Sequence, residues 1–359
     1  MFIEHRIEGL RGYMKKLGLD QVLIYDPVNL NYFAPIGARV NDRATFLYVT
    51  MDDCRILAND VIGYTTLDDK YTVYHTDGDD VCEAIAKVTM HDKPLAVDGK
   101  YPAKWLLPLK KAGAASDYIL ADRAVNLQRA HKDAEEQQLL REASLMNDRV
   151  MKRVRGVFRD GITEREASRI ISQFFVEEGA DKPGWCIVAF EENAANPHSH
   201  PGDRALKPGD TILVDMGSPR KQYHSDMTRT FFWKSVDDRH RAIYELVKNA
   251  NLAGEAAVKP GARCCDVDAA ARDMITEAGY GKYFLHRLGH YIGLELHDPG
   301  DIIFGNTDPV EPGMAFSCEP GVYLAGDFGV RVEDLVIVKP DGTAEVLNHD
   351  NKELEILGI

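Results

Sequence analysis

The pattern of hydrophobic and polar residues changes once along the chain. In residues 1–124, short apolar runs typical of strands alternate with stretches in which apolar residues recur at helical spacing. This alternation predicts an α/β layer around a mainly buried sheet. Strands are expected at 21–26, 45–50, 54–60, 94–98 and 117–122, and helices at 3–17, 79–90 and 103–113.

The second part of the chain begins with a long charged helix. From about residue 126 to 158 the pattern is that of one continuous amphipathic helix, and this change predicts two domains, 1–124 and 125–359. A further helix is expected to begin at Thr163, because Thr163 and Glu166 have the spacing of a capping box. The first domain shows neither a phosphate-binding glycine motif nor a cluster of metal ligands, so it is interpreted as a scaffold.

The composition excludes several classes of function. A hydrophobic fraction of 45% and a charged fraction of 28% are typical of a globular protein, and no uncharged apolar run approaches the roughly 20 residues that span a bilayer. The N-terminus lacks the apolar core of a signal peptide. A net charge of −14 argues against nucleic-acid and anionic-membrane partners. Six cysteines without a regular spacing predict reduced thiols and a cytoplasmic protein.

Two segments of the second domain resemble each other. In KPGDTILVDMG (207–217) and EPGMAFSCEPG (311–321), Pro-Gly precedes a strand that ends on a carboxylate, Asp215 or Glu319. Each strand is followed by a second strand that also carries a carboxylate, Asp226 or Glu333. The repeat predicts two similar half-motifs that face one site.

Opposed carboxylates in these hairpins would need a cation. If residues 209–233 form a hairpin that turns near SPRKQ, Asp215 and Asp226 lie opposite each other, with Cβ atoms about 4.5–5.5 Å apart. Two like charges so close are unfavourable unless a proton or a cation lies between them, and the same holds for Glu319 and Glu333. Four converging carboxylates therefore predict two divalent metal ions, which would activate a water molecule and polarise a scissile carbonyl.

Histidine is the usual nitrogen ligand of such metals, and five histidines lie in two short segments. These are His198, His200, His286, His290 and His297. The pair His286 and His290 has i, i+4 spacing but lacks the Glu of a helical HExxH motif, and Gly289 disfavours a helix there. The spacing alone does not choose the ligand among the five.

Five motifs, in order, resemble those of the pita-bread-fold metallopeptidases, and among them the Xaa-Pro peptidases (prolidases and proline aminopeptidases). They are ILVDMG, HSDMTRTF, HRLGHYIGLELHD, FSCEPGVY and VRVEDLVIV, and the N-terminal stretch RIEGLRGYMKKLGLDQVLIYDPVNLNYF resembles the start of the creatinase-like domain of that family. The resemblance implies an α/β creatinase-like N-terminal domain, an α+β pita-bread catalytic domain with an internal pseudo-two-fold axis, and a homodimer.

The resemblance also implies roles for individual residues. Five ligands would bind two metal ions: Asp215, Asp226, His290, Glu319 and Glu333, of which Asp226 and Glu333 would bridge. Glu319 would move a proton for the metal-bridging water that acts as nucleophile. His198 and His297 would stabilise the tetrahedral intermediate or hold the substrate, and Arg331 would orient this network or contact a substrate carboxylate. Such ligands suit Mn, Co, Zn or Fe; manganese is the first expectation.

The chain departs from the family pattern at four places. Tyr291 stands where a Gly usually follows the metal-binding His, so it is expected to contact substrate and narrow the pocket. Residues 221–222 occupy a turn in which Gly is common, and Asp298 replaces a Glu. Residues 298–318 contain no Arg or Lys, although relatives that cleave dipeptides often carry an arginine there to bind the free carboxylate.

Three hypotheses about function follow. The first is metal-dependent hydrolysis of the Xaa-Pro bond in short proline-containing peptides, either as a dipeptidase or as an aminopeptidase. The second is a pita-bread protein without peptidase activity that serves as a binding scaffold, and the third is a creatinase-like hydrolase of a non-peptide amide. The second and third should lack some of the five ligands, and this chain retains all five. The sequence therefore favours the peptidase.

Overall fold

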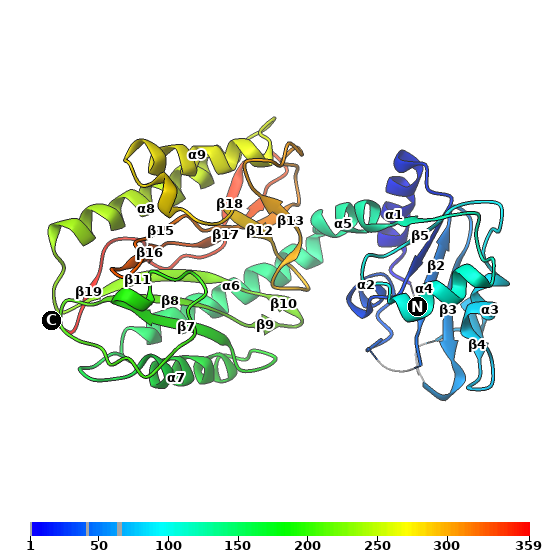
Figure 1. The fold of residues 1–359 in the computed structure, drawn as a ribbon, viewed down its shortest axis with the longest axis horizontal. Coiled ribbons are helices and arrows are strands. Elements are labelled where there is room, and N and C mark those ends of the chain that lie inside the picture. The colour runs from blue at the N-terminus through cyan, green and yellow to red at the C-terminus, as the bar shows by residue number, and fades with distance from the viewer. Residues whose placement is uncertain (1, 41–42, 63–66) are drawn as a thin grey trace. The chain divides into compact units, whose positions relative to one another are not determined.

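A computed structural model describes residues 2–40, 43–62 and 67–359, and the chain divides into two compact units between Arg129 and Ala130 (Figure 1). The sequence placed this boundary after residue 124. The difference arises at helix α5 (Asp122–Ala130), which belongs almost entirely to the first unit. No helix in the described part of the chain is both long enough and apolar enough to cross a bilayer.

The first unit is the expected α/β layer. Its six-stranded sheet has the order β4-β3-β2-β1-β5-β6, and β5 pairs in parallel with both β1 and β6. The strands are β1 (Gln21–Ile24), β2 (Phe46–Thr50), β3 (Cys54–Asn59), β4 (Thr72–His75), β5 (Leu95–Val97) and β6 (Tyr118–Leu120). The helices are α1 (Glu4–Leu17), α2 (Pro27–Phe33), α3 (Val81–Ala86) and α4 (Ala103–Lys111). The sequence prediction missed β4 and α2, although Asp26 caps α2 by accepting a hydrogen bond from Asn29 N.

The second unit consists of two consecutive repeats of two helices and three strands. The first repeat is α6 (Ala134–Val154), α7 (Glu164–Glu177), β7 (Trp185–Phe190), β8 (Thr211–Gly217) and β11 (Met227–Trp233). The second is α8 (Asp238–Ala257), α9 (Cys264–Glu277), β12 (Gly289–Tyr291), β14 (Ala315–Cys318) and β17 (Asp334–Val338). The sheets have the orders β19-β11-β8-β7 and β13-β12-β14-β17-β18, so the three strands of each repeat follow the same order. This confirms the internal pseudo-two-fold arrangement predicted from the sequence.

Shorter elements complete the second unit. They are β9 (Pro219–Arg220), β10 (Tyr223–His224), β13 (Asp298–Ile302), β15 (Gly321–Tyr323), β16 (Gly329–Arg331), β18 (Ala344–Val346) and β19 (Ile356–Leu357). The helices lie outside the strands, with α8 and α9 on one side and α7 on the other (Figure 1). One apolar core includes Phe175 and Phe190, and another includes Val247 and Phe316. All residues of β8 and β11 are buried, although β11 contains a polar stretch, 228–230. The charge of Arg229 in that stretch is paired with Asp334, 2.7 Å away.

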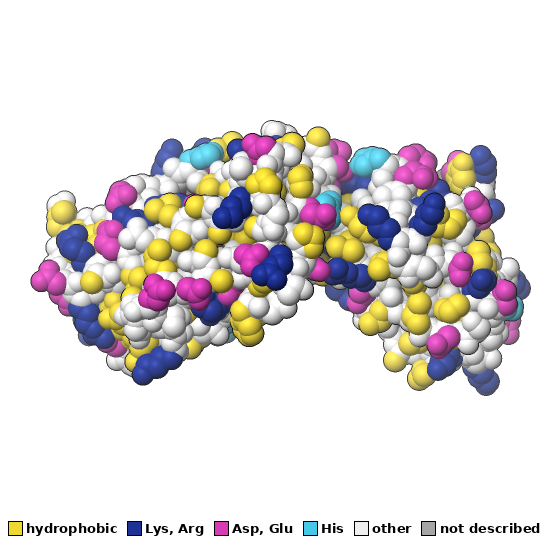
Figure 2. Space-filling view, turned by 90° about the horizontal axis from the view of Figure 1, so that it is seen from above, with side chains coloured by type: hydrophobic (Ala, Val, Ile, Leu, Met, Phe, Trp, Pro, Cys, Tyr) yellow, Lys and Arg dark blue, Asp and Glu magenta, His cyan; other side chains and the backbone are white. Residues whose placement is uncertain are grey.

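The surface of the molecule carries mixed charge. On the face drawn in Figure 2, acidic and basic side chains are interspersed, and the described residues there form no continuous basic stripe. Recognition of nucleic acid needs such a stripe. The expected absence of a nucleic-acid partner stays a prediction.

The register of the first hairpin differs from the sequence prediction. Asp215 pairs with Thr228 and Met216 with Met227, and the same register places Asp226 opposite Gly217. The turn consists of Lys221 and Gln222, whose φ values of 49° and 71° are those of a two-residue type I′ turn. Asp215 and Asp226 therefore occupy diagonal positions on one face of the hairpin and are not directly opposed.

The long helix predicted over residues 126–158 is broken into α5 and α6. Lys132 N donates to the carbonyl of Gly313, which interrupts the helical hydrogen bonds. Asp133 then begins α6 as its N-cap, because its side chain accepts from Glu136 N and the Glu136 side chain accepts from Asp133 N. The capping box predicted at Thr163 and Glu166 is present at the start of α7.

His240 makes the stability of the second unit dependent on pH. Its ring lies on Phe328, and its two nitrogens are 2.8 Å from Asp237 Oδ1 and 3.1 Å from Glu191 Oε1. Burial opposes protonation, but the hydrogen bonds to these two carboxylates outweigh it, and the pKa of His240 is raised. A raised pKa stabilises the fold below the ordinary pKa, and this contribution disappears as the pH rises through the folded-state pKa.

We therefore expect His240→Gln to lower the midpoint of thermal unfolding more at pH 6 than at pH 9. The additional loss in the free energy of unfolding at pH 6 should be about 1.5–3 kcal/mol, the contribution of a hydrogen bond to a charged group. Unfolding curves of both proteins at the two pH values provide the measurement. An equal loss at both values would show that His240 contributes by packing alone.

Candidate active site

The four carboxylates of the two half-motifs meet where the two sheets touch. Asp215 lies in β8, Asp226 immediately precedes β11, Glu319 follows β14 and Glu333 precedes β17. Gly321 pairs with Arg331 and Cys318 with Asp334 in one common register, which places Glu319 opposite Glu333. The halves are joined directly, since Glu333 N donates to the carbonyl of Thr228 at 3.1 Å.

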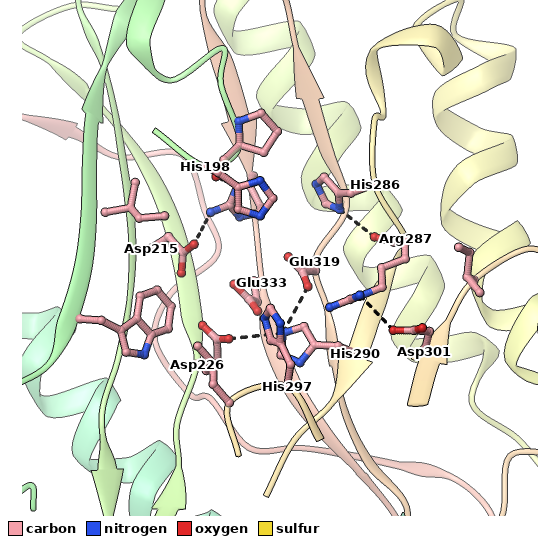
Figure 3. Close-up of a pocket in the computed structure, with 16 residues that line it drawn as sticks. His198, Asp215, Asp226, His286, Arg287, His290, His297, Asp301, Glu319 and Glu333 are labelled. Carbon is pink, nitrogen blue, oxygen red and sulfur yellow. Dashed lines mark hydrogen bonds and ion pairs between the residues drawn. The ribbon is translucent and has the colours of Figure 1, made fainter. Parts of the chain in front are cut away.

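His290 brings an imidazole nitrogen to these carboxylates (Figure 3). Its Nε2 lies 3.5 Å from Asp226 Oδ2 and 3.5 Å from Glu319 Oε1. The other ring nitrogen, Nδ1, lies 3.1 Å from the carbonyl oxygen of Tyr291, so a proton on Nδ1 leaves Nε2 available to a metal ion. Ligand atoms of Asp226, His290 and Glu333 all lie within 4.8 Å of one another and could hold one ion.

A glycine permits this position of His290. A Cβ at Gly289 would lie 1.7 Å from the carbonyl oxygen of Ser317 in β14, so only glycine allows β12 and β14 to approach as they do. The adjacent backbone is fixed as well, because His290 N donates to Ser317 Oγ at 3.0 Å. Ser317 Oγ in turn donates to Glu319 Oε1 at 3.0 Å.

Several carboxylate oxygens of the cluster have no hydrogen-bond donor among the described residues, and this favours a bound cation. Asp215 Oδ1, Asp226 Oδ1 and Glu333 Oε1 are buried and accept no hydrogen bond from any residue that the structure describes. A buried carboxylate oxygen without a donor is costly, and a group of them in one place calls for a positive partner. Four carboxylates and one imidazole are a donor set that suits divalent transition metals. The residues present therefore fit the metal ions that the sequence predicts.

The pKa values of these groups follow from the same crowding. Burial, together with the neighbouring carboxylates, raises the pKa of Asp226 and Glu333 well above the ordinary values. Burial also acts on Glu319, but the nearby His290, His286 and Arg331 side chains outweigh it, and the pKa of Glu319 is lowered. A divalent cation would favour the ionised form of all the carboxylates.

Arg331 holds Asp215 in position directly and Glu333 through Thr228. It is 2% exposed, and its Nη2 forms an ion pair with Asp215 Oδ2. Its Nε donates to Thr228 Oγ1 at 3.0 Å, and Thr228 Oγ1 donates to Glu333 Oε2 at 2.6 Å. Nη1 donates to Tyr323 Oη at 2.9 Å. These contacts favour the orienting role among the two expected for Arg331.

A cavity of about 520 Å³ lies over this cluster. Of the nine residues predicted for the site, eight line it: His198, Asp215, Asp226, His290, His297, Glu319, Arg331 and Glu333. Figure 3 shows His198 and His297 on opposite sides of the carboxylates. The rings of His290 and His297 are 4.1 Å apart. Partial burial and the charges of His290 and Arg287 lower the pKa of His297 to about 4, so this ring is neutral at neutral pH.

Tyr291, the ninth residue, is not among the residues that line this cavity. It is 5% exposed, pairs with Phe316 across the sheet, and directs its hydroxyl toward the sulfur atoms of Cys264 and Met314. Successive side chains of a strand point to opposite faces, so when His290 faces the cavity Tyr291 faces the core. The prediction that Tyr291 contacts the substrate is therefore corrected, because its side chain lies in the core and not in the cavity.

The sequence analysis missed several residues of the cavity. Apolar walls come from Trp185, Ile187, Pro197, Leu296 and Ile303, and further polar groups from His286, Arg287 and Asp301. The ring nitrogens of His286 lie 2.8 Å from Tyr323 Oη and 2.7 Å from the carbonyl oxygen of Arg287, so both have partners within the protein. The apolar residues carry no signal of their own, because a strand of a buried sheet has the same composition.

Comparison with known families gives two matches that together cover most of the chain. The family model of metallopeptidase family M24 matches residues 138–340. The family model of the creatinase/prolidase N-terminal domain matches residues 6–131. The two matched segments correspond to the two units of the structure.

Individual relatives match three quarters or more of the chain. The Xaa-Pro dipeptidase of Lactobacillus delbrueckii subsp. lactis is 32% identical over 98% of this chain and 99% of its own length. The probable dipeptidase PepE of Mycobacterium tuberculosis is 38% identical over 76% of this chain and 73% of its own. The crystal structure of dipeptidase PepE from Mycobacterium ulcerans superposes with a TM-score of 0.91 at 31% identity, covering 99% of this chain and 98% of that one.

Proposed function

This chain belongs to metallopeptidase family M24, and from that premise we propose that it is an Xaa-Pro dipeptidase that uses two divalent metal ions. One observation carries the proposal: unpartnered buried oxygens of Asp215, Asp226 and Glu333 converge beside the Nε2 atom of His290. The scaffold and creatinase-like alternatives are less well supported, because all five expected ligands line one cavity.

The metal ions would be held by five residues: Asp215, Asp226, His290, Glu319 and Glu333. When bound, two divalent ions polarise the scissile carbonyl and lower the pKa of a water molecule between them. Manganese is the metal we propose first, since a carboxylate-rich set with one imidazole suits it. Arg331 and Thr228 would keep Asp215 and Glu333 in place through their hydrogen bonds.

The remaining steps fall to side chains of the cavity. Among the described residues outside the ligand cluster, only Ser317 donates a hydrogen bond to the Glu319 side chain. The pKa of Glu319 is lowered, so its carboxylate is ionised and can accept a proton. His297, neutral at neutral pH, and His198 would stabilise charge that develops on the carbonyl oxygen. Apolar residues such as Trp185 and Ile187 provide a surface on which a proline ring can pack.

Metal removal and reloading tests the proposal. Protein stripped by a chelator and reloaded separately with Mn, Co or Zn is incubated with Ala-Pro and with Ala-Pro-Ala. We expect hydrolysis only with metal, and faster hydrolysis of Ala-Pro. Preference for Ala-Pro-Ala would identify an aminopeptidase. Two bound metal ions without cleavage of either peptide would contradict the Xaa-Pro substrate class.

Two further expectations stay predictions. The chain is expected to form a homodimer, which light scattering on the purified protein measures. It is also expected to be cytoplasmic, which fractionation of the source cells measures.

A further inference from the structure

The cavity contains two cationic side chains among its described lining residues, Arg287 and Arg331, and their surroundings differ. Arg331 is nearly inaccessible, and all three of its nitrogen atoms already have partners in Asp215, Thr228 and Tyr323. Its positive charge is therefore engaged by Asp215, and almost none of the side chain is open to a ligand. Of the two arginines, Arg287 is the one that a negatively charged group of a substrate can reach.

Arg287 is available to a ligand. Its side chain is 31% exposed, and its guanidinium reaches into the cavity toward Glu319 and His290 (Figure 3). Its side chain has one partner among the described residues, Asp301, whose Oδ1 lies 3.0 Å from Nη1. Asp301 is itself 47% exposed, and ion pairs in such a setting are weak. The other guanidinium N–H groups can donate to a group that enters the cavity.

The chemistry of the proposed substrate places a negative charge in this region. In an Xaa-Pro dipeptide one carbon atom separates the scissile nitrogen from the proline carboxylate. A scissile bond held at the carboxylate cluster therefore brings the substrate carboxylate within a few ångströms of that cluster. The substrate carboxylate would then lie in a partly enclosed, acidic part of the cavity, where a cationic side chain beside it lowers the cost of burying its charge. In a longer peptide the same position holds a neutral amide.

We propose that Arg287 binds the C-terminal carboxylate of an Xaa-Pro dipeptide and thereby makes the site selective for dipeptides. The inference rests on the proposed function and adds the residue that decides substrate length. An arginine matches a carboxylate with two parallel N–H donors, which a neutral amide cannot use in the same way. The arginine comes from the segment before β12, whereas residues 298–318 supply its acidic partner, Asp301, and no basic residue.

The test compares two substrates that differ only in this group, Ala-Pro and Ala-Pro-amide, on the metal-loaded protein. For Arg287→Gln we expect the ratio of kcat/KM for Ala-Pro to that for Ala-Pro-amide to fall roughly 10- to 100-fold, the effect of losing a hydrogen-bonded charge pair. The loss should appear mainly in KM for Ala-Pro. Arg287→Lys, which keeps the charge but not the paired donors, should give an intermediate ratio.

Asp301→Asn is the matched control. It removes the competing partner and leaves Arg287 in place, so the same ratio is expected to rise, by at most about fivefold for so exposed a pair. A ratio that falls in Asp301→Asn as far as in Arg287→Gln would mean that the pair acts only as structure, and would overturn the inference. So would an equal change for both substrates in Arg287→Gln.

Failure of the proposed function gives a different result. If the unsubstituted, metal-loaded protein cleaves neither substrate, the Xaa-Pro assignment fails before Arg287 is tested. In that case the carboxylate contact is tested by inhibition, which needs no cleavage of a proline bond. Hydrolysis of any other amide at the site is measured in the presence of free proline or of prolinamide. Weaker inhibition by proline in Arg287→Gln, with inhibition by prolinamide less affected, supports the inference.

Discussion

Asp226→Asn is expected to abolish metal binding and peptide hydrolysis together. Asp226 is 3% exposed, its Oδ1 accepts no hydrogen bond, and its Oδ2 lies 3.5 Å from His290 Nε2. An amide at this position keeps the shape of the side chain but replaces the charged carboxylate with one neutral oxygen, which is a weaker ligand for a divalent cation. Since bound metal ions contribute several kcal/mol to catalysis, hydrolysis of Ala-Pro should fall roughly a thousandfold or more.

The same substitution should stabilise the protein from which metal has been stripped. Burial and the charges of Asp215 and Glu319 raise the pKa of Asp226, which means that its ionised form is unfavourable in the fold. Removing that charge is therefore expected to raise the midpoint of thermal unfolding of the stripped protein, by about 2–4 °C for each kcal/mol. Added manganese should then stabilise the variant less than the parent.

The measurement combines metal content after dialysis, turnover and unfolding curves with and without manganese. Asp301→Asn is the control, because it makes the same chemical change in the same cavity at a residue outside the metal cluster. This control should retain its metal ions. A variant Asp226→Asn that keeps two metal ions and full turnover would remove Asp226 from the ligand set.

The internal repeat could be recognised from sequence because its signal is local. Asp215 in β8 and Glu319 directly after β14 each lie six residues after the Gly of a Pro-Gly pair, and both line the same cavity. The register of the first hairpin was not predictable in the same way. Its type I′ turn uses Lys221 and Gln222 in a conformation that glycine and asparagine usually adopt, so the sequence places a turn near SPRKQ without showing which two residues form it.

Two differences could have been predicted from the residues themselves. Asp133 and Glu136 have the spacing of a capping box, which marks the start of α6 inside the supposed single helix. Tyr291 follows His290 in a strand, so strict alternation assigns its side chain to the opposite face. The capping box and the alternation of side chains along a strand are both local rules, and both would have given the observed structure.

Arg287 shows what a single sequence does not contain. It is adjacent in sequence to His286, yet its proposed role follows from the contacts that other residues of the cavity make. Arg331 is engaged by side chains from three different elements, and Asp301 lies on a separate strand. Only the folded chain shows which of the two arginines is accessible to a substrate.

His198→Ala is expected to retain both metal ions and lose most turnover. His198 is exposed and lines the cavity on the side opposite His297, outside the cluster of Asp226, His290 and Glu333 (Figure 3). Removal of an exposed side chain should change the free energy of unfolding by no more than about 0.5 kcal/mol. Loss of a group that stabilises charge in the transition state typically reduces kcat by about 10²–10³.

His200→Ala separates this role from a general effect of the loop. His200 is also exposed and only two positions away, but it does not line the cavity. Its removal should leave turnover, metal content and stability unchanged. Because the parent and both variants should bind metal equally, a difference in kcat alone isolates the contribution of the His198 ring to the chemical step. Full turnover in His198→Ala, or an equal loss in both variants, would show that the ring does not act on the substrate and that His297 must stabilise the developing charge without it.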